Sequence, residues 1–422
     1  MYVKLTKFEW QWLTICHIIS KTTAGKVTLM STTVDASLMR HVNKRTVLGL
    51  LYQEKAISRS DISRTTGLNR ATVSSLVDEL IADQFVVEVG TGRSSGGRRP
   101  IILQFNTETG YVIGVDVQIT HVTTVLANAG REVVFQHRRN IDAMAAPLDE
   151  SALTRLIAEE IAVVKRVCPP SPHGLMGVGV GLPGLVDHQR GKAIYLPNLG
   201  ITDWNVRDSL AAFESLPIFV DNDANCGAWS EYLSTRVPHL IFVNAGIGVG
   251  AGIIINGHLY RGAGGLAGEA GHHAISPTGD DCHCGNIGCW EQYASERAIQ
   301  HSLAAAGALM PDILPSDFVD QCVREADAGN PIYLAAFETL AQHLGVGLVN
   351  LLNLFNPTAV FLSGTLAEAY HLMQPTLASI VETRAMFMNR HIPVTPASSI
   401  SVALGAAGLA LAQSIALLPT VL

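Results

Sequence analysis

Three cysteines and a histidine in the second half of the chain have the spacing of a metal site. Cys282, Cys284 and Cys289 follow the pattern Cys-x-Cys with a third cysteine five positions on, and His272 stands ten positions before the first thiol. Three thiolates and one imidazole form the tetrahedral set that zinc prefers. Because four protein ligands leave no position for water, the spacing predicts a structural zinc site, not a catalytic one. The alternative is that these are ordinary buried thiols or a redox pair.

Composition places the chain in a reducing compartment. Seven cysteines occur in 422 residues, and the four outside the cluster are scattered. So few and scattered cysteines do not form a disulfide framework, and this cysteine content is typical of an intracellular protein. We therefore expect a cytoplasmic location. The apolar stretch at residues 10–20 is too short to span a bilayer, and the stretch at 402–418 is rich in Ala and Gly. We predict that both are packed helices and that no part of the chain inserts into a membrane.

Charge is divided unevenly along the chain. Residues 40–100 carry ten Lys or Arg against six Asp or Glu, whereas residues 101–422 carry fifteen against twenty-eight. The basic segment is therefore the candidate for a polyanionic partner such as operator DNA. Residues 1–40 precede it as an N-terminal extension of unknown role.

The basic segment has the pattern of a winged helix-turn-helix, which we place at residues 41–105. Apolar spacing indicates a helix over 43–53, Ser58 is expected to cap a second helix, and a third helix starts near Asn69. The third helix would bury its apolar side and present short polar groups to a major groove. Two strands, at 85–89 and 101–105, would flank a basic wing.

The predicted DNA contacts are polar groups on these helices and arginines of the wing. They are Ser58, Asn69, Arg70, Thr72, Ser74, Ser75, Arg93, Arg98 and Arg99. Polar and basic side chains of this kind contact phosphates and base edges. The simpler alternative is a small packing or dimerisation module whose arginines lie in a solvated loop.

After residue 105 the pattern changes to short apolar strands that alternate with helices. Strands are predicted at 111–117, 122–127, 177–181, 218–220, 241–244 and 359–362. Several of them close on a Gly or Asp turn. This order predicts an α/β fold that binds ligands at the ends of its strands.

Several motifs in this part resemble the ROK family of bacterial repressors and sugar kinases. They are Asp221-Asn222-Asp223-Ala224-Asn225, the glycine run that ends at Gly252, Gly268-Glu269-Ala270-Gly271-His272, and the cysteine motif Cys-x-Cys-Gly-x-x-Gly-Cys-x-Glu. The resemblance implies two actin-like, ribonuclease-H-like lobes, at 106–236 plus 394–422 and at 237–393. It also implies a monosaccharide inducer in the cleft, with xylose the first candidate, and a homodimer or dimer of dimers that uses the second lobe.

The resemblance further implies which residues bind the sugar. They are Asn222, Asp223, Glu269, His272, Glu291, Gly184 and Asn198, with Trp204 near the cleft. Asp223 stands at the position of the general base in the kinases, and His272 would both bind zinc and face the sugar. Carboxylates with an amide and an imidazole can satisfy several sugar hydroxyls at once. On residue type alone, the carboxylates could equally be surface or helix-capping groups.

The sequence departs from the kinases of this family at three phosphate loops. Gln118 and Ile119 replace both glycines of Asp-x-Gly-Gly-Thr, Asn244-Ala245-Gly246 replaces Gly-Thr-Gly, and Ser363-Gly364 replaces a glycine pair. Side chains at such positions hinder the close approach of backbone amides to phosphate. We therefore predict a sugar-responsive repressor that has lost phosphoryl transfer and is not an enzyme. The alternatives are an active sugar kinase with an appended DNA-binding domain, and a repressor released by a sugar-transporter subunit.

Overall fold

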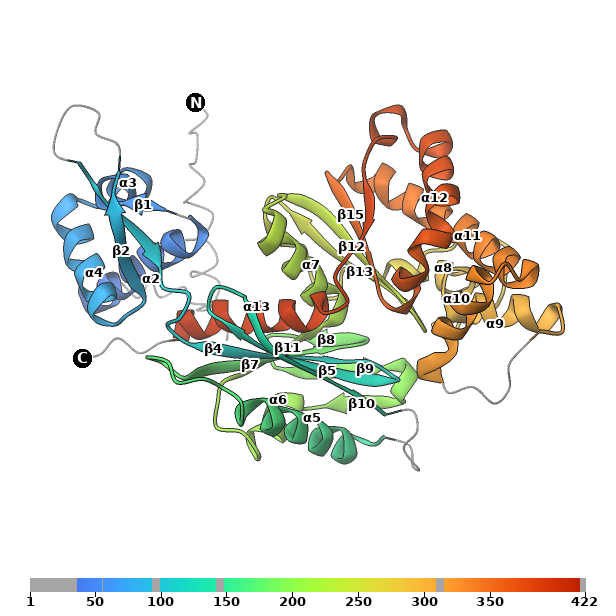
Figure 1. The fold of residues 1–422 in the computed structure, drawn as a ribbon, viewed down its shortest axis with the longest axis horizontal. Coiled ribbons are helices and arrows are strands. Elements are labelled where there is room, and N and C mark those ends of the chain that lie inside the picture. Colours follow the sequence, from blue (N-terminus) through green and yellow to red (C-terminus); the bar gives the residue numbers. More distant parts are fainter. Residues whose placement is uncertain (1–35, 55, 93–98, 142–147, 309–314, 418–422) are drawn as a thin grey trace, which may run out of the picture. The chain divides into compact units, whose positions relative to one another are not determined.

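The computed structural model describes residues 36–54, 56–92, 99–141, 148–308 and 315–417 (Figure 1). It divides the chain into two units, residues 1–44 and 45–422. Of the first unit, only residues from 36 onward are described, so the predicted N-terminal extension lies almost wholly outside the described residues. All further elements belong to the second unit.

The N-terminal elements form in the order expected for a winged helix-turn-helix. They are α2 (Ala36–Gln53), β1 (Ile57–Ser58), α3 (Arg59–Thr66), α4 (Arg70–Ala82), β2 (Val86–Thr91) and β3 (Ile101–Phe105). The helix α2 begins at Ala36, ahead of the predicted residue 43. The strand β3 pairs antiparallel with both β1 and β2. The four apolar positions of α4 that the helical spacing assigned to the core are all buried.

Side-chain caps fix where α3 and α4 begin. The Ser58 hydroxyl accepts a hydrogen bond from Asp61 N at 3.2 Å, and Asn69 Oδ1 accepts one from Thr72 N at 2.8 Å. Each satisfies a backbone donor that has no partner within the first turn of a helix. Between the helices, Gly67 adopts a φ of 73°, which a residue without Cβ reaches at no steric cost.

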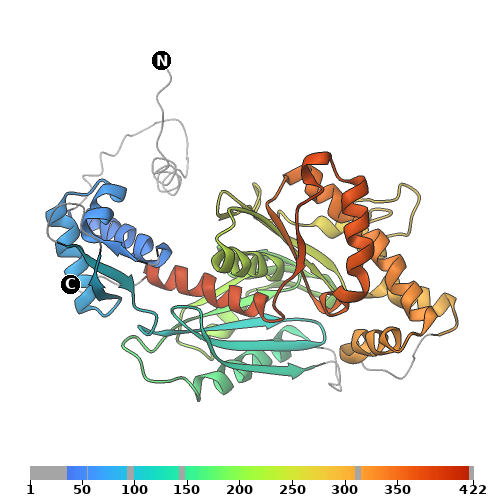
Figure 2. The same ribbon diagram turned by 45° about the horizontal axis from the view of Figure 1, so that its top comes forward.

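The first large sheet has five strands in the order β11-β7-β4-β5-β6. They are β4 (Tyr111–Val117), β5 (His121–Asn128), β6 (Val133–Asn140), β7 (Leu175–Leu182) and β11 (Ile218–Asn222). The helices α5 (Glu150–Lys165) and α6 (Val206–Ala211) cover one face and α13 (Ser401–Leu417) covers the other (Figures 1 and 2). A small sheet of β8 (Leu185–Asp187), β9 (Lys192–Leu196) and β10 (Ile201–Trp204) follows β7.

The second large sheet repeats the topology of the first, with the order β14-β13-β12-β15-β16. Its strands are β12 (His239–Ala245), β13 (Val249–Ile255), β14 (His258–Leu259), β15 (Ala359–Ser363) and β16 (Val394–Pro396). Its helices are α8 (Trp290–Tyr293), α9 (Glu296–Ala305), α10 (Phe318–Asp327), α11 (Pro331–Phe355) and α12 (Tyr370–Arg384). In each sheet an antiparallel meander is extended by two parallel strands. The first sheet lies within the range predicted for the first lobe, whereas β16, which the prediction placed in the first lobe, pairs with β15 of the second sheet.

The Ala- and Gly-rich helix α13 packs closely against the first sheet and against α7 (Asp223–Thr235). A Cβ added to Gly114 of β4 would lie 1.9 Å from Ala403 O, and one added to Gly405 would lie 1.8 Å from Cys226 O. Larger side chains would force these backbones apart, so the small residues are a packing requirement. Within the predicted stretch at 402–418, the described residues 402–417 thus form a packed helix, as predicted.

Among the described residues, one helix, α11, is long and apolar enough to cross a membrane by length and composition. In the structure, 56% of its most apolar window is buried. Its apolar side chains, among them Phe337, Leu344 and Leu348, belong to the core of the second sheet.

Candidate ligand-binding cleft and metal cluster

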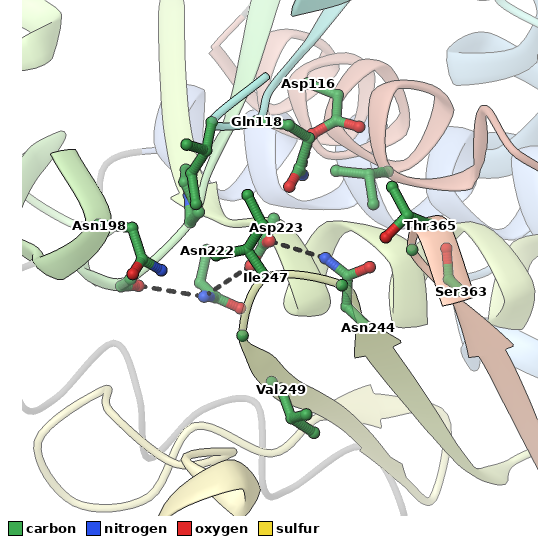
Figure 3. Close-up of a pocket in the computed structure, with 18 of the residues that line it drawn as sticks. Asp116, Gln118, Asn198, Asn222, Asp223, Asn244, Ile247, Val249, Ser363 and Thr365 are labelled. Atoms are coloured by element: carbon green, nitrogen blue, oxygen red, sulfur yellow. Dashed lines mark hydrogen bonds between the residues drawn. The ribbon is translucent and has the colours of Figure 1, made fainter. Parts of the chain in front are cut away.

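A cavity of about 370 Å³ lies between the loops of the two large sheets (Figure 3). Its volume is within the range of small-molecule sites. All seven residues that the sequence singled out for sugar binding line it: Gly184, Asn198, Asn222, Asp223, Glu269, His272 and Glu291. Trp204 does not line it, because its side chain is 1% exposed and packs in the core beside the first sheet.

Asn222 and Asp223 stand where β11 ends and α7 begins. Asn222 caps α7 by accepting from Asn225 N at 3.1 Å, and its own amide donates to Asp223 Oδ1 at 3.0 Å. The Ala224 N–H donates to the same carboxylate oxygen at 2.8 Å. Burial raises the pKa of Asp223, while hydrogen bonds from the Ala224 N–H and from the amides of Asn244 and Gln118 oppose the rise. The result is a buried acceptor held at the N-terminus of a helix.

Gly184 is required at its position by conformation and by space. Its φ is 136°, and an added Cβ would lie 2.5 Å from Tyr195 O. Its carbonyl oxygen accepts a hydrogen bond from Asn222 Nδ2 at 3.1 Å. Gly184 therefore orients the Asn222 amide and leaves the cavity open, although it offers no side chain to a ligand.

The opposite wall carries two glutamates. Glu291 Oε2 accepts from Val249 N at 3.1 Å, so the start of α8 is tied to β13. Burial, with the charges of Asp223 and Glu291, raises the pKa of Glu269 to about 7. At neutral pH the Glu269 carboxyl can therefore donate as well as accept a hydrogen bond.

His272, Cys282, Cys284 and Cys289 form one cluster whose ligand atoms lie within 4.8 Å of one another. Cys282 Sγ is 3.6 Å from His272 Nδ1, and Cys284 Sγ is 3.6 Å from Cys289 Sγ. Tetrahedral ligands of zinc, with bonds of about 2.3 Å to sulfur and about 2.0–2.1 Å to nitrogen, lie roughly 3.6–3.8 Å apart. The donor set is thus the one that zinc prefers, and both of these separations are close to those between tetrahedral ligands.

Electrostatics at the cluster also favour a cation. Burial and the neighbouring thiols Cys284 and Cys282 raise the pKa of Cys289 to about 12, because thiolates this close repel one another. A bound cation would remove that repulsion. The neighbouring His273 turns away from the sulfurs, since its Nδ1 contacts Ala270 O and its Nε2 lies 3.3 Å from Asn350 Nδ2. His283 instead lines the cavity, with Nδ1 3.7 Å from Glu291 Oε1.

Further polar residues line the cavity that the sequence did not mark as ligand-binding. They are Asp116, Gln118, Arg138, Asn244, Glu296, Thr365 and Glu368. Burial, with the charge of Asp223, raises the pKa of Asp116 to about 7 against the opposing hydrogen bond from Gln118. Gln118 and Asn244 were noticed only as replacements of loop glycines. Glu296 and Glu368 belong to no motif, and only the tertiary fold brings them to the cleft.

Most of the predicted DNA-contacting residues that the structure describes are exposed or half-buried, but one of them is buried. Asn69, Arg70, Ser75 and Arg99 are exposed, and Thr72 and Ser74 are half-buried along α4. Ser58 is 2% exposed, and its hydroxyl bonds to Asp61 within α3. It cannot present that hydroxyl to DNA, so we withdraw it from the predicted contacts. Arg93 and Arg98 lie outside the described residues.

Comparison with known proteins gives one family and a consistent group of relatives. The family described as the ROK family matches residues 112–413. A xylose repressor of Caldicellulosiruptor bescii is 36% identical over 386 residues, which are 87% of this chain and 95% of the relative. A xylose repressor of Bacillus subtilis is 35% identical over 83% of this chain and 89% of the relative. The Escherichia coli DNA-binding regulator NagC is 30% identical over 83% of this chain and 87% of its own.

Two solved structures resemble this fold. A ROK family transcriptional regulator, a homologue of the Escherichia coli MLC protein, superposes with a TM-score of 0.72 at 25% identity, covering 90% of this chain and 98% of its own. A ROK family glucokinase from Streptomyces griseus, in complex with glucose and AMPPNP, superposes with a TM-score of 0.63 at 27% identity. The match covers 71% of this chain and 99% of the glucokinase. The regulator thus covers a larger share of this chain than the kinase does.

Proposed function

The chain belongs to the ROK family, and we propose that it is a sugar-responsive transcriptional repressor that binds its inducer in the cleft between the two sheets. The observation that carries this proposal is the meeting of all seven implied sugar-binding residues around one cavity of suitable volume. The repressors that it resembles match it over 95% and 89% of their own length. Such a repressor acts on DNA in the cytoplasm.

The inducer would be held by opposing sets of polar groups. Asn222 and Asp223 on one wall and Glu269 and Glu291 on the other offer acceptors to a ring of hydroxyls. Asn198 adds a second amide. Xylose stays the first candidate, because two of the relatives are named as xylose repressors.

Zinc at the cysteine cluster would brace one wall of this cleft. His272 belongs both to the cluster and to the cavity lining, and Cys289 directly precedes α8, which carries Glu291. A metal bound there would therefore fix two ligand-binding side chains at once. The metal's contribution is structural, since all four positions of a tetrahedral ion are filled by protein.

The operator would be read by α4 in the major groove, with the wing arginines on the phosphates. Ser75 lies opposite the buried positions of that helix, and Arg70, Thr72 and Ser74 lie outside its buried stripe. A homodimer or dimer of dimers would present two such helices to a near-palindromic site. Inducer binding would stabilise an arrangement of the two sheets in which the paired helices no longer match the half-site spacing.

The test begins with operators selected by the full-length protein from a random DNA pool. Sugars and sugar derivatives are then added to the protein–DNA complex, and release is followed by fluorescence anisotropy. Release by a sugar alone supports the proposal and removes the need for a transporter subunit. Failure of every sugar to release DNA or to shift the thermal unfolding midpoint would contradict it. A ligand at about one hundred times its Kd should stabilise the fold by roughly 2.7 kcal/mol.

An active kinase is the second candidate, because the Streptomyces griseus glucokinase shares the fold of the two sheets. Gln118, Asn244 and Ser363 occupy the loops that would approach phosphate, which weighs against it. Turnover of ATP with any aldose at an ordinary enzymatic rate would decide for the kinase.

A further inference from the structure

Two side-chain amides enter the cleft from different sheets, and each contacts a buried carboxylate. Gln118, which follows β4, donates from Nε2 to Asp116 Oδ1 at 2.6 Å. Asn244 of β12 donates from Nδ2 to Asp223 Oδ2 at 2.8 Å. Figure 3 shows both amides beside their carboxylates at the end of the cleft that Ser363 and Thr365 line.

Three donors at this end of the cleft are already used within the protein. The Gln118 N–H donates to His121 O at 2.8 Å, and the Gly246 N–H donates to Gly248 O at 2.9 Å. The Thr365 hydroxyl donates to Glu296. A phosphate group needs several unoccupied donors directed at one point. These three groups could serve a phosphate only by breaking bonds inside the fold.

The charge of the lining is unfavourable to an anion as well. Six carboxyl groups line the cavity: Asp116, Asp223, Glu269, Glu291, Glu296 and Glu368. Arg138 is the single Arg or Lys among the described lining residues. A phosphate ester would bring its negative charge to this surface, whereas a neutral polyol would bring hydroxyl donors to its acceptors.

We propose that Gln118 and Asn244 determine the specificity of the cleft, by holding Asp116 and Asp223 as acceptors for a neutral sugar and by closing the adjoining end to phosphate. This inference rests on the proposed function and specifies the chemical class of the inducer. The inducer is a monosaccharide without a phosphate ester. Sugar phosphates and nucleoside triphosphates are excluded by the same residues.

The first experiment is isothermal titration calorimetry on the full-length protein. The probes are xylose, glucose and N-acetylglucosamine, then glucose 6-phosphate, N-acetylglucosamine 6-phosphate and AMPPNP with Mg²⁺. A neutral sugar should bind at least 100-fold more tightly than any phosphate-bearing probe. A phosphate ester that binds as tightly as its parent sugar would overturn this inference but leave the sugar response standing. Absence of binding by every probe, in protein that still binds DNA, would overturn the proposed function and this inference with it.

The second experiment tests the two amides. Gln118→Ala and Asn244→Ala should each weaken binding of the neutral sugar about tenfold, and the double variant should lose at least tenfold in selectivity over the phosphate ester. Asn244→Leu keeps a side chain of similar size but removes the amide donor. It should therefore weaken binding of the neutral sugar yet preserve the selectivity for the neutral sugar over the phosphate ester. Gln136→Ala, at an exposed position of β6, is the matched control. A folding defect would lower all affinities together, so an unchanged selectivity in the double variant would refute the role of these amides.

Discussion

The guanidinium of Arg261 and the carboxylate of Asp221 form a two-pronged ion pair, with N–O distances of 3.0 and 2.6 Å. Asp221 closes β11 of the first sheet, directly before Asn222, and Arg261 follows β14 of the second sheet. The side chains are 21% and 7% exposed for Arg261 and Asp221. The pair therefore joins the two sheets behind the ligand-binding wall, and paired geometry of this kind is among the stronger polar contacts.

Arg261→Ala should destabilise the protein markedly, because it leaves the Asp221 carboxylate buried without its cation. Removal of one partner of a buried pair typically costs about 3–5 kcal/mol in the free energy of unfolding. Urea unfolding measures this. The control is Arg190→Ala, which breaks the pair with Asp187 at a site where the arginine side chain is 82% exposed. That change should cost less than about 1 kcal/mol. Equal losses in the two variants would mean that the Arg261 pair does not hold the sheets together.

Cys282→Ser and Cys284→Ser should each remove the bound metal and lower the thermal unfolding midpoint. A thiolate is a much better zinc ligand than a hydroxyl, and a metal bound there would stabilise the segment that carries Glu291. Zinc content per chain, measured by mass spectrometry of the purified protein, checks the first effect, and thermal unfolding followed by circular dichroism checks the second. Cys168→Ser, outside the cluster, should change neither. Full zinc content in both cluster variants would refute the assignment.

Local features of the fold could be predicted from the sequence because local physics fixes them. The Asn69 cap and the apolar spacing that follows locate α4, and the strands at 111–117 and 101–105 have the predicted bounds. The spacing of the cysteines similarly anticipates a cluster that the structure brings within ligand distance. In each case the residues that interact are close in sequence, or the period of the pattern identifies the buried face.

Contacts between distant segments could not be predicted in this way. Arg261 and Asp221 are forty positions apart and meet only because the two sheets face each other. Ser58 shows a different difficulty, since one hydroxyl was expected both to cap α3 and to contact DNA, and the buried cap uses it. The bonds of Gln118 and Asn244 to Asp116 and Asp223 also depend on tertiary placement. The sequence showed that glycines were missing there, but not what the replacing amides contact.

Asp116→Asn should stabilise the protein at alkaline pH. Burial raises the pKa of Asp116 from its ordinary 3.8 to about 7, so between those values the folded state keeps a proton that the unfolded state releases. The free energy of unfolding therefore falls as pH rises through this window, and the loss is complete above about pH 7. The amide cannot ionise, so at pH 8 the variant should be more stable by about 2–4 kcal/mol.

Urea unfolding of the wild-type protein and of Asp116→Asn at pH 5 and pH 8 checks this prediction. The difference between their free energies of unfolding should be smaller at pH 5. Asp187→Asn supplies a control of opposite sign. Hydrogen bonds and the charge of Arg190 outweigh burial and lower the pKa of Asp187, so that substitution should destabilise the protein at pH 8. A pH-independent effect of Asp116→Asn would show that its carboxyl does not titrate in this window.

Arg70→Ala should weaken operator binding without altering the inducer Kd. Arg70 opens α4 and is exposed on the helix proposed to enter the major groove. Loss of a base contact would cost about 1–3 kcal/mol and relax the sequence preference, whereas loss of a phosphate contact would weaken all sequences alike and reduce the salt slope by about one. Anisotropy titrations at two salt concentrations, on operator and on scrambled DNA, separate these effects. Arg155→Ala, exposed on α5, is the matched control. If both variants bind operator equally well, α4 is not the reading helix, and the segment from α2 to β3 is a packing module instead.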